Sequence, residues 1–161
     1  MRYQIRQRIF SLSDSFTIKD EIGEPHFIVR GRVFSLGDKL SLEDLYGNEL
    51  FYIEQKLFKF LPEYHIFQNG VLVATVKKEF TLFKPKFFIE SEYGAFDMAG
   101  DVFGYNFQIT KNGTNVATVN KKWFAFSDTY GVEIIDGENN AFLLALVIVI
   151  DQVIHDNKHK S

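Results

Sequence analysis

The chain has 161 residues, of which 46% are hydrophobic and 24% are charged, and its net charge is −3. This composition is typical of one globular domain and excludes an intrinsically disordered chain. Because the chain contains no cysteine, disulfides, thiolate metal sites and cysteine nucleophiles are excluded, and its slight acidity gives no general attraction to nucleic acid.

The first predicted element is a strand around residues 4–10. The N-terminal segment contains arginines but lacks the continuous apolar core of a signal peptide, so we expect a cytoplasmic protein. Eighteen Phe, seven Tyr and one Trp favour β-sheet in the rest of the chain, because aromatic side chains suit a pleated and half-buried surface.

A sequence repeat in the middle of the chain predicts β-hairpins. Residues 66–78 (IFQNGVLVATVKK) recur 43 residues later as residues 109–121 (ITKNGTNVATVNK). Asn-Gly between apolar runs is a strong hairpin signal, since both residues tolerate the positive φ of a type I′ turn. Weaker copies of this turn surround Gly23, Gly47, Gly94 and Gly137.

The spacing of these glycines sets the number of strands. Gly23, Gly47, Gly70, Gly94 and Gly113 each have a strand on both sides, which gives ten strands. One strand before them and another around residues 130–135 bring the total to about twelve. Short antiparallel strands must hide their edges, and a closed barrel does this completely. We therefore expect a mainly β fold with a closed antiparallel barrel.

The apolar segment 141–150 admits three interpretations. A transmembrane helix needs about 20 apolar residues, which is more than this run contains. A central strand suits its β-branched second half. A buried helix suits its Leu- and Ala-rich first half, with Asn139 or Asn140 as the N-cap. We favour a helix over about 140–154 inside the barrel, because a barrel of this size has an interior to fill. One domain then spans 1–155, followed by a polar tail at 156–161.

Five segments together resemble the LURP-one-related family, which groups with tubby C-terminal domains and phospholipid scramblases. The resemblance rests on residues 34–42 (FSLGDKLSL), 47–50 (GNEL), 73–80 (VATVKKEF), 83–87 (FKPKF) and 136–137 (DG). It covers the chain from Tyr3 to about Asp151 and implies a twelve-stranded antiparallel barrel around a C-terminal hydrophobic helix.

The resemblance also implies a class of function. Tubby-type domains bind phosphoinositide head groups, scramblase relatives act at membranes, and plant members of the family are associated with pathogen defence. No family motif assigns catalytic residues to positions of this chain. We therefore expect a non-enzymatic binding or scaffold protein, peripheral at a membrane if it engages lipid. A scramblase-like role and an unrecognised hydrolase are the alternatives.

A basic cluster is the main candidate site. It consists of Lys77, Lys78, Lys84 and Lys86, near Phe80, Phe83 and Trp123, with Lys121 and Lys122 as its copy in the repeat. Lysines can hold a phosphate as point charges while aromatic rings meet a lipid surface. The competing interpretation is that these lysines protect strand edges from association. We therefore expect the cluster to bind an anionic phospholipid or a protein partner. If the lysines only protect strand edges, the cluster binds no ligand.

Other candidates have weaker support. His155 and His159 have helical spacing for a metal, but the residues between them lack the glutamate of a zincin, and we expect no metal. No glycine-rich phosphate loop is present, so we expect no cofactor. Single polar residues complete the set: Arg30, Arg32, His26, His65, Ser11, Ser13, Ser15, Glu43, Asp44, Glu90, Glu92, Asp97 and Asp101.

Overall fold

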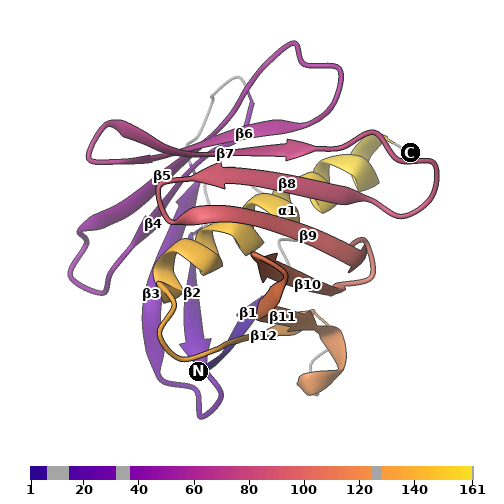
Figure 1. Cartoon of the computed structure of the whole chain (residues 1–161). Coiled ribbons are helices and arrows are strands. Elements are labelled where there is room, and N and C mark those ends of the chain that lie inside the picture. The colour runs from indigo at the N-terminus through magenta and orange to yellow at the C-terminus, as the bar shows by residue number, and fades with distance from the viewer. Residues whose placement is uncertain (7–14, 32–36, 125–127, 161) are drawn as a thin grey trace.

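The structure is a computed structural model that describes residues 1–6, 15–31, 37–124 and 128–160, with only the backbone described at 157–160. It contains one long helix, one 3₁₀ turn and twelve strands within these ranges (Figure 1). The strands are β1 (Arg2–Arg6), β2 (Ser15–Asp20), β3 (Pro25–Gly31), β4 (Lys39–Glu43), β5 (Glu49–Gln55), β6 (Glu63–Gln68), β7 (Val71–Lys78), β8 (Lys86–Ser91), β9 (Gly94–Asp101), β10 (Asn106–Lys111), β11 (Thr114–Asn120) and β12 (Thr129–Ile134).

The strands form a closed barrel in which each strand is antiparallel to the next one along the chain. The barrel closes where β1 pairs with β12, from Arg2 opposite Glu133 to Arg6 opposite Thr129. Closure removes both free edges of the sheet, which is what twelve short strands require. The predicted fold class and strand number are confirmed.

The Asn-Gly hairpins have the backbone that the sequence repeat predicts. Asn69 and Gly70 have φ values of 51° and 79°, and Asn112 and Gly113 have 52° and 80°. Both hairpins also carry a register shift just before the turn, at Ile66/Phe67 in β6 and at Ile109/Thr110 in β10. The repeat is therefore structural as well as sequential.

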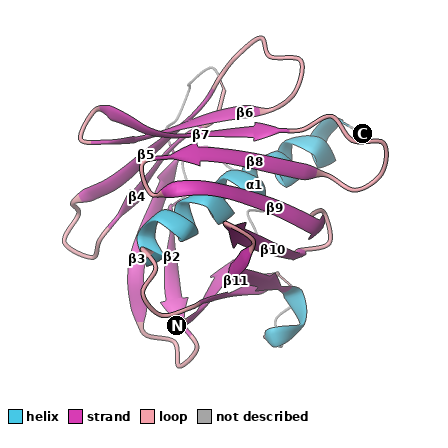
Figure 2. Ribbon diagram, viewed as in Figure 1, coloured by secondary structure: helices cyan, strands magenta, loops and turns pink. Residues whose placement is uncertain are grey.

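The interior of the barrel is filled by α1 (Asn140–Lys160), which the strands surround in Figure 2. The side chain of Asn139 accepts a hydrogen bond from the amide of Phe142 at 3.0 Å, as an N-cap does. All side chains from Phe142 to Ile154 are buried. The central helix is confirmed, but its predicted end at about 154 is wrong. The helix continues to Lys160 because polar residues extend its hydrogen-bond ladder after the apolar face ends.

The antiparallel order gives the barrel two different ends. The turn end carries the short connections at 21–24, 44–48, 69–70, 92–93 and 112–113, and the segment 135–139 before α1. Among the described residues, the loop end carries the connections at 56–62, 79–85 and 102–105, the 3₁₀ turn at 121–123, and the last turns of α1. Tyr64, at the start of β6, bonds Asp156 there.

Candidate functional site

The four predicted site lysines belong to one hairpin at the loop end. Lys77 and Lys78 finish β7, Lys86 begins β8, and Lys84 lies in the loop between these strands. Lys77, Lys84 and Lys86 are exposed, whereas Lys78 is partly buried. The hairpin therefore brings together all four residues that the sequence singled out.

The strand alternation divides these lysines between two faces. Val76 and Phe87 are buried in the barrel, so their neighbours Lys77 and Lys86 lie on its outer face. Lys78 instead lines a small pocket in the mouth of the barrel, together with Tyr64 and Asp156. A charged ligand at the outer surface would meet Lys77, Lys84 and Lys86, and Lys78 belongs to a separate environment.

Edge protection does not explain these lysines. β7 pairs with both β6 and β8, and β8 pairs with both β7 and β9. Neither strand has an open edge that a lysine would need to guard. Among the residues that the structure describes, no carboxylate pairs with Lys77, Lys84 or Lys86, whereas Lys111 lies 3.5 Å from Glu138.

The hairpin loop 79–85 lies beside the β5–β6 loop, 56–62. The amide of Lys78 donates to the carbonyl of Pro62 at 3.0 Å, which joins the two loops at their bases. The amide of Glu79 donates to the carbonyl of Lys86 at 2.8 Å, and the Thr81 hydroxyl donates to the carbonyl of Lys84 at 2.8 Å. These bonds hold both loops in defined conformations at the end of the barrel.

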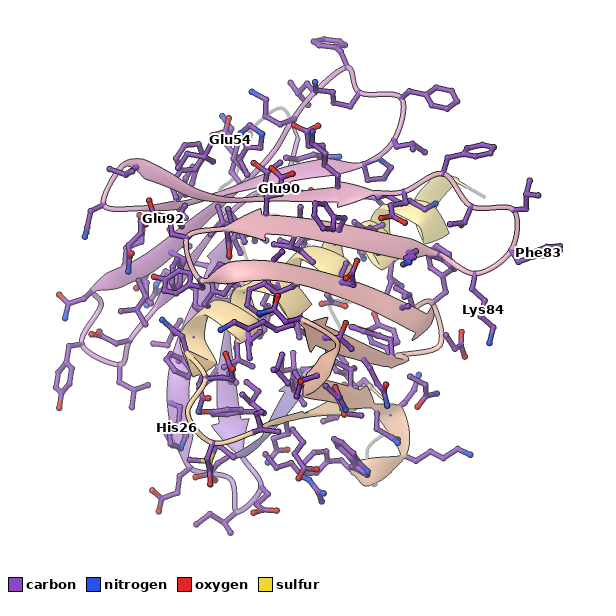
Figure 3. All side chains as sticks on the ribbon, in the orientation of Figure 1. His26, Glu54, Phe83, Lys84, Glu90 and Glu92 are labelled. Atoms are coloured by element: carbon purple, nitrogen blue, oxygen red, sulfur yellow. The ribbon has the colours of Figure 1, made fainter. Side chains whose placement is uncertain are left out.

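Large apolar side chains project from both loops into solvent. Phe58, Phe60 and Phe83 are 102%, 93% and 93% exposed, and Figure 3 shows Phe83 and Lys84 pointing away from the barrel. Leu82, Phe80 and Leu57 on the same loops are also exposed. Six large exposed apolar side chains on two loops joined at their bases are typical of an interaction surface. We call residues 56–62 and 77–86 together the aromatic-lysine tip.

One of these aromatic residues has an unfavourable backbone. Phe58 has a φ of 61°, a region that bulky side chains rarely adopt. Such a conformation costs about 1–2 kcal/mol for an L-residue and often occurs at functional positions. The chain thus holds a fully exposed aromatic ring in a conformation that an asparagine or a glycine would adopt more easily.

The aromatic-lysine tip and the turn end carry opposite net charges. The aromatic-lysine tip contains six lysines against Glu79 alone, which gives a local charge of +5. The turn end contains nine acidic residues against Lys111 alone (within 20–25, 43–49, 68–71, 91–94, 111–114 and 134–139), which gives −8. Lys59 is partly neutralised by Glu63, 3.9 Å away. A chain of net charge −3 therefore carries a strong charge asymmetry along its barrel axis.

A buried polar network closes the loop end around α1, and the sequence did not predict it. The Tyr64 hydroxyl donates its one hydrogen between the carboxylates of Asp38, at 2.7 Å, and Asp156, at 3.3 Å. The Tyr105 hydroxyl donates to Asp151 at 2.7 Å. Burial, and next the nearby carboxylates, raise the pKa of Tyr64 and of Tyr105, so both hydroxyls stay protonated donors. The sequence feature that pointed to this network is Asp151, a charged residue directly after the apolar run 141–150 of α1.

Several predicted candidates have structural partners. His26 lies 2.9 Å from Asp20, and His65 lies 3.0 Å from Glu63. Arg30 pairs with Glu43 at 3.1 Å. These contacts join nearby positions on the barrel and account for the polar groups that take part in them.

The copy of the lysine pair lies in the 3₁₀ turn η1 (Lys121–Trp123) between β11 and β12. The ring of Trp123 is partly buried, with the Arg2 guanidinium 4.4 Å from its centre, so it does not extend the aromatic-lysine tip. Lys121 lies 5.7 Å from the ring of Tyr105. The repeat thus reproduces the β-hairpin but not the exposed aromatic loop.

The remaining acidic, hydroxyl and basic candidates are dispersed. Asp44 accepts hydrogen bonds from backbone amides of its own turn, and Asp101 accepts one from Gly104. Glu90 and Glu92 are exposed at β8 and the turn after it (Figure 3), Asp97 lies in β9, and Ser15 begins β2. Arg32, Ser11, Ser13 and the side chain of His159 lie outside the described residues.

Two negative observations apply to the described part of the chain. No three of its His, Asp and Glu residues lie close enough to hold a metal ion. None of its helices has both the length and the apolar character needed to cross a bilayer.

Comparison with known proteins gives one family. The model of the LURP-one-related family matches residues 1–151. The chain is 39% identical over 157 residues to the uncharacterized protein YxjI of Bacillus subtilis (strain 168), covering 98% of this chain and 96% of that protein. The X-ray structure of an Arabidopsis thaliana protein has the same fold, with a TM-score of 0.69 and 19% identity over 94% of this chain and 91% of that one.

Proposed function

The chain belongs to the LURP-one-related family, and on that premise we propose that it is a non-enzymatic module that binds phosphate-bearing anionic head groups through its loop-end lysines. The observation that carries the proposal is the β7–β8 hairpin, which gathers Lys77, Lys84 and Lys86 at one exposed position without carboxylate partners in the described structure.

The chemistry of lysine supports a phosphate ligand. Its ammonium group is a compact point charge with three donors on a flexible stem, and it attracts phosphates without a fixed orientation. Each lysine close to an anionic membrane surface contributes about 1 kcal/mol of attraction. Three exposed lysines therefore supply about 3 kcal/mol, which is roughly a hundredfold in affinity.

The position of α1 favours this surface role over a membrane-spanning one. The helix is buried from Phe142 to Ile154, and its apolar side chains fill the barrel. Contact with lipid through these side chains would require the barrel to open. Surface binding requires no such change, and we therefore place the proposed protein at the face of a membrane on the cytoplasmic side.

Vesicle sedimentation at low and high salt tests the proposal. We expect the wild-type chain to bind phosphatidylcholine vesicles only when phosphatidylserine or a phosphoinositide is added, and to bind more weakly as salt increases. The triple variant Lys77→Glu, Lys84→Glu, Lys86→Glu should lose this binding.

The matched control is a charge reversal elsewhere on the barrel. Lys19 is exposed in β2 near the turn end, and Lys19→Glu should bind vesicles as the wild type does, whereas the neutral variant Lys84→Gln should bind about fivefold more weakly. Absence of wild-type binding to any anionic vesicle at low salt would overturn the proposal, as would binding that the triple variant retains.

A further inference from the structure

We infer that the two aromatic loops insert into the interface of an anionic bilayer and dock the barrel end-on, with the loop end towards the membrane. The inference rests on the proposed function and deepens it, because it names a lipid bilayer, rather than a soluble phosphate, as the partner of the aromatic-lysine tip.

The aromatic-lysine tip exposes large apolar side chains to water. Phe58, Phe60 and Phe83 have more than nine-tenths of their surface in water, and Leu82 has 82%. Apolar surface gains free energy in proportion to the area removed from water. Aromatic side chains also favour the head-group region of a bilayer. The tip therefore presents the chemical groups that interfacial insertion uses.

Hydrogen bonds fix the bases of both loops in the absence of lipid. Their bases are joined by the bond from the Lys78 amide to the Pro62 carbonyl, and loop 79–85 is closed by the bonds of Glu79 and Thr81. Ordering a flexible loop on binding costs conformational entropy, so a preformed loop binds more tightly. Phe58, with a φ of 61°, is fully exposed in loop 56–62.

The charge around the exposed apolar groups identifies an anionic bilayer as the partner of the aromatic-lysine tip. The turn end also exposes apolar groups, since Tyr46 is 92% exposed and Ile22 is 79% exposed. Those residues lie among acidic side chains, whereas Phe58 and Phe83 lie within two residues of Lys56, Lys59 and Lys84. An anionic bilayer attracts the loop end and repels the turn end. The long stems of the lysines allow their ammonium groups to reach lipid phosphates while the rings enter the interface.

The geometry of the barrel fits end-on docking. Both loops connect neighbouring strands at the same end (Figure 1). Lys78, at the base of loop 79–85, lines one pocket with Val153 and Asp156 of α1. Insertion of the loop tips leaves every strand pair and the whole buried helix in place. The barrel therefore binds without losing any of its core.

The double variant Phe58→Ser, Phe83→Ser tests insertion separately from head-group binding. Tyr46→Ser, Ile22→Ser is its control, with two exposed apolar residues removed at the turn end. We expect the first variant to partition at least about tenfold more weakly onto phosphatidylserine-containing vesicles. It should bind a soluble inositol phosphate, measured by calorimetry, as the wild type does. The control should match the wild type in both measurements, and both variants should keep the wild-type unfolding midpoint.

The outcomes separate the two proposals. If the Phe variant binds vesicles as strongly as the wild type while the lysine triple variant loses binding, insertion is wrong and head-group binding stands. If vesicle binding depends on the Phe residues but not on the lysines or on salt, insertion stands and head-group binding is wrong. A dimer that requires Phe58 and Phe83, with no vesicle binding, overturns both and makes a second copy of the chain the occupant.

Discussion

The two ends of the barrel solve the same problem, the reversal of an antiparallel chain, in opposite ways. At the turn end the reversals are short and satisfy their own hydrogen bonds: Asp20 accepts from the amides of Ile22 and Glu24, and Asp44 accepts from those of Tyr46 and Asn48. At the loop end the 56–62 and 79–85 connections are longer and leave aromatic rings in water.

The backbone shows the same contrast. Among the described residues, positive φ values at the turn end belong only to asparagine and glycine, which tolerate them, whereas at the loop end Phe58 and Tyr105 adopt them as well as Gly37 and Gly100. The polar side chains of the turn end serve its own turns. Those of the aromatic-lysine tip have no such role in the described structure, and this difference is why we propose the loop end as the functional end.

The largest expected effect is a loss of stability. It should occur in α1, which joins the two ends, and not at the loop tip. Leu146 is fully buried in α1, and Leu82 is 82% exposed at the tip. Leu146→Asp buries an unpaired charge and should destabilise the chain by about 4 kcal/mol or more, leaving little folded protein. Leu82→Asp makes the same chemical change in solvent and should alter stability by less than about 0.5 kcal/mol. Urea unfolding measures both, and equal losses would contradict the placement of α1.

Backbone substitutions should act with opposite sign at the two ends. Gly113 has a φ of 80° and open space around it, so Gly113→Ala introduces only backbone strain and should cost about 1–2 kcal/mol. Phe58→Asn should instead leave stability unchanged or raise it by up to about 1 kcal/mol, because asparagine tolerates φ of 61° better than phenylalanine. The same variant should bind anionic vesicles more weakly. Thermal unfolding of both variants checks the signs, and destabilisation by Phe58→Asn would contradict the strain argument.

A smaller effect concerns the turn end at acid pH. The hydrogen bond from the Asn48 side chain, and next the Asn48 backbone amide, lower the pKa of Asp44. A carboxyl whose pKa is lower in the folded state stabilises the fold above its unfolded pKa of about 3.9, and this stabilisation is lost as pH falls through the folded value.

Asp44→Ala should therefore be less stable than the wild type at neutral pH, and the difference should shrink below about pH 4. Denaturant unfolding at both pH values measures it. A constant difference across this range would show that the charge of Asp44 does not contribute to the turn.

The sequence predicted the architecture because periodic features determine it. The Asn-Gly turns at Gly70 and Gly113 fixed the strand spacing, and the run from Ala141 to Ile150 favoured a helix in the barrel interior over a central strand or a transmembrane helix. Single side chains were harder. The position of Lys78 at the mouth of the barrel follows only from the register of β7. The hydrogen-bond partners of Asp151 and Asp156 lie 46 and 92 residues away in the sequence. The sequence analysis did not single out the apolar residues of 57–61 (LFKFL) as part of a site. Apolar residues in a connection have no strand or helix periodicity that would indicate their role.

Paired tryptophan reporters test the central claim, that the loop end and not the turn end meets the bilayer. On a Trp123→Phe background the chain has no other tryptophan, and Phe83→Trp and Tyr46→Trp place one at equally exposed positions of the two ends. With phosphatidylserine vesicles that carry an acyl-chain quencher, we expect a blue shift and quenching of the reporter at 83 and neither at 46. Equal quenching at both positions, or quenching at 46 alone, would contradict the end-on account.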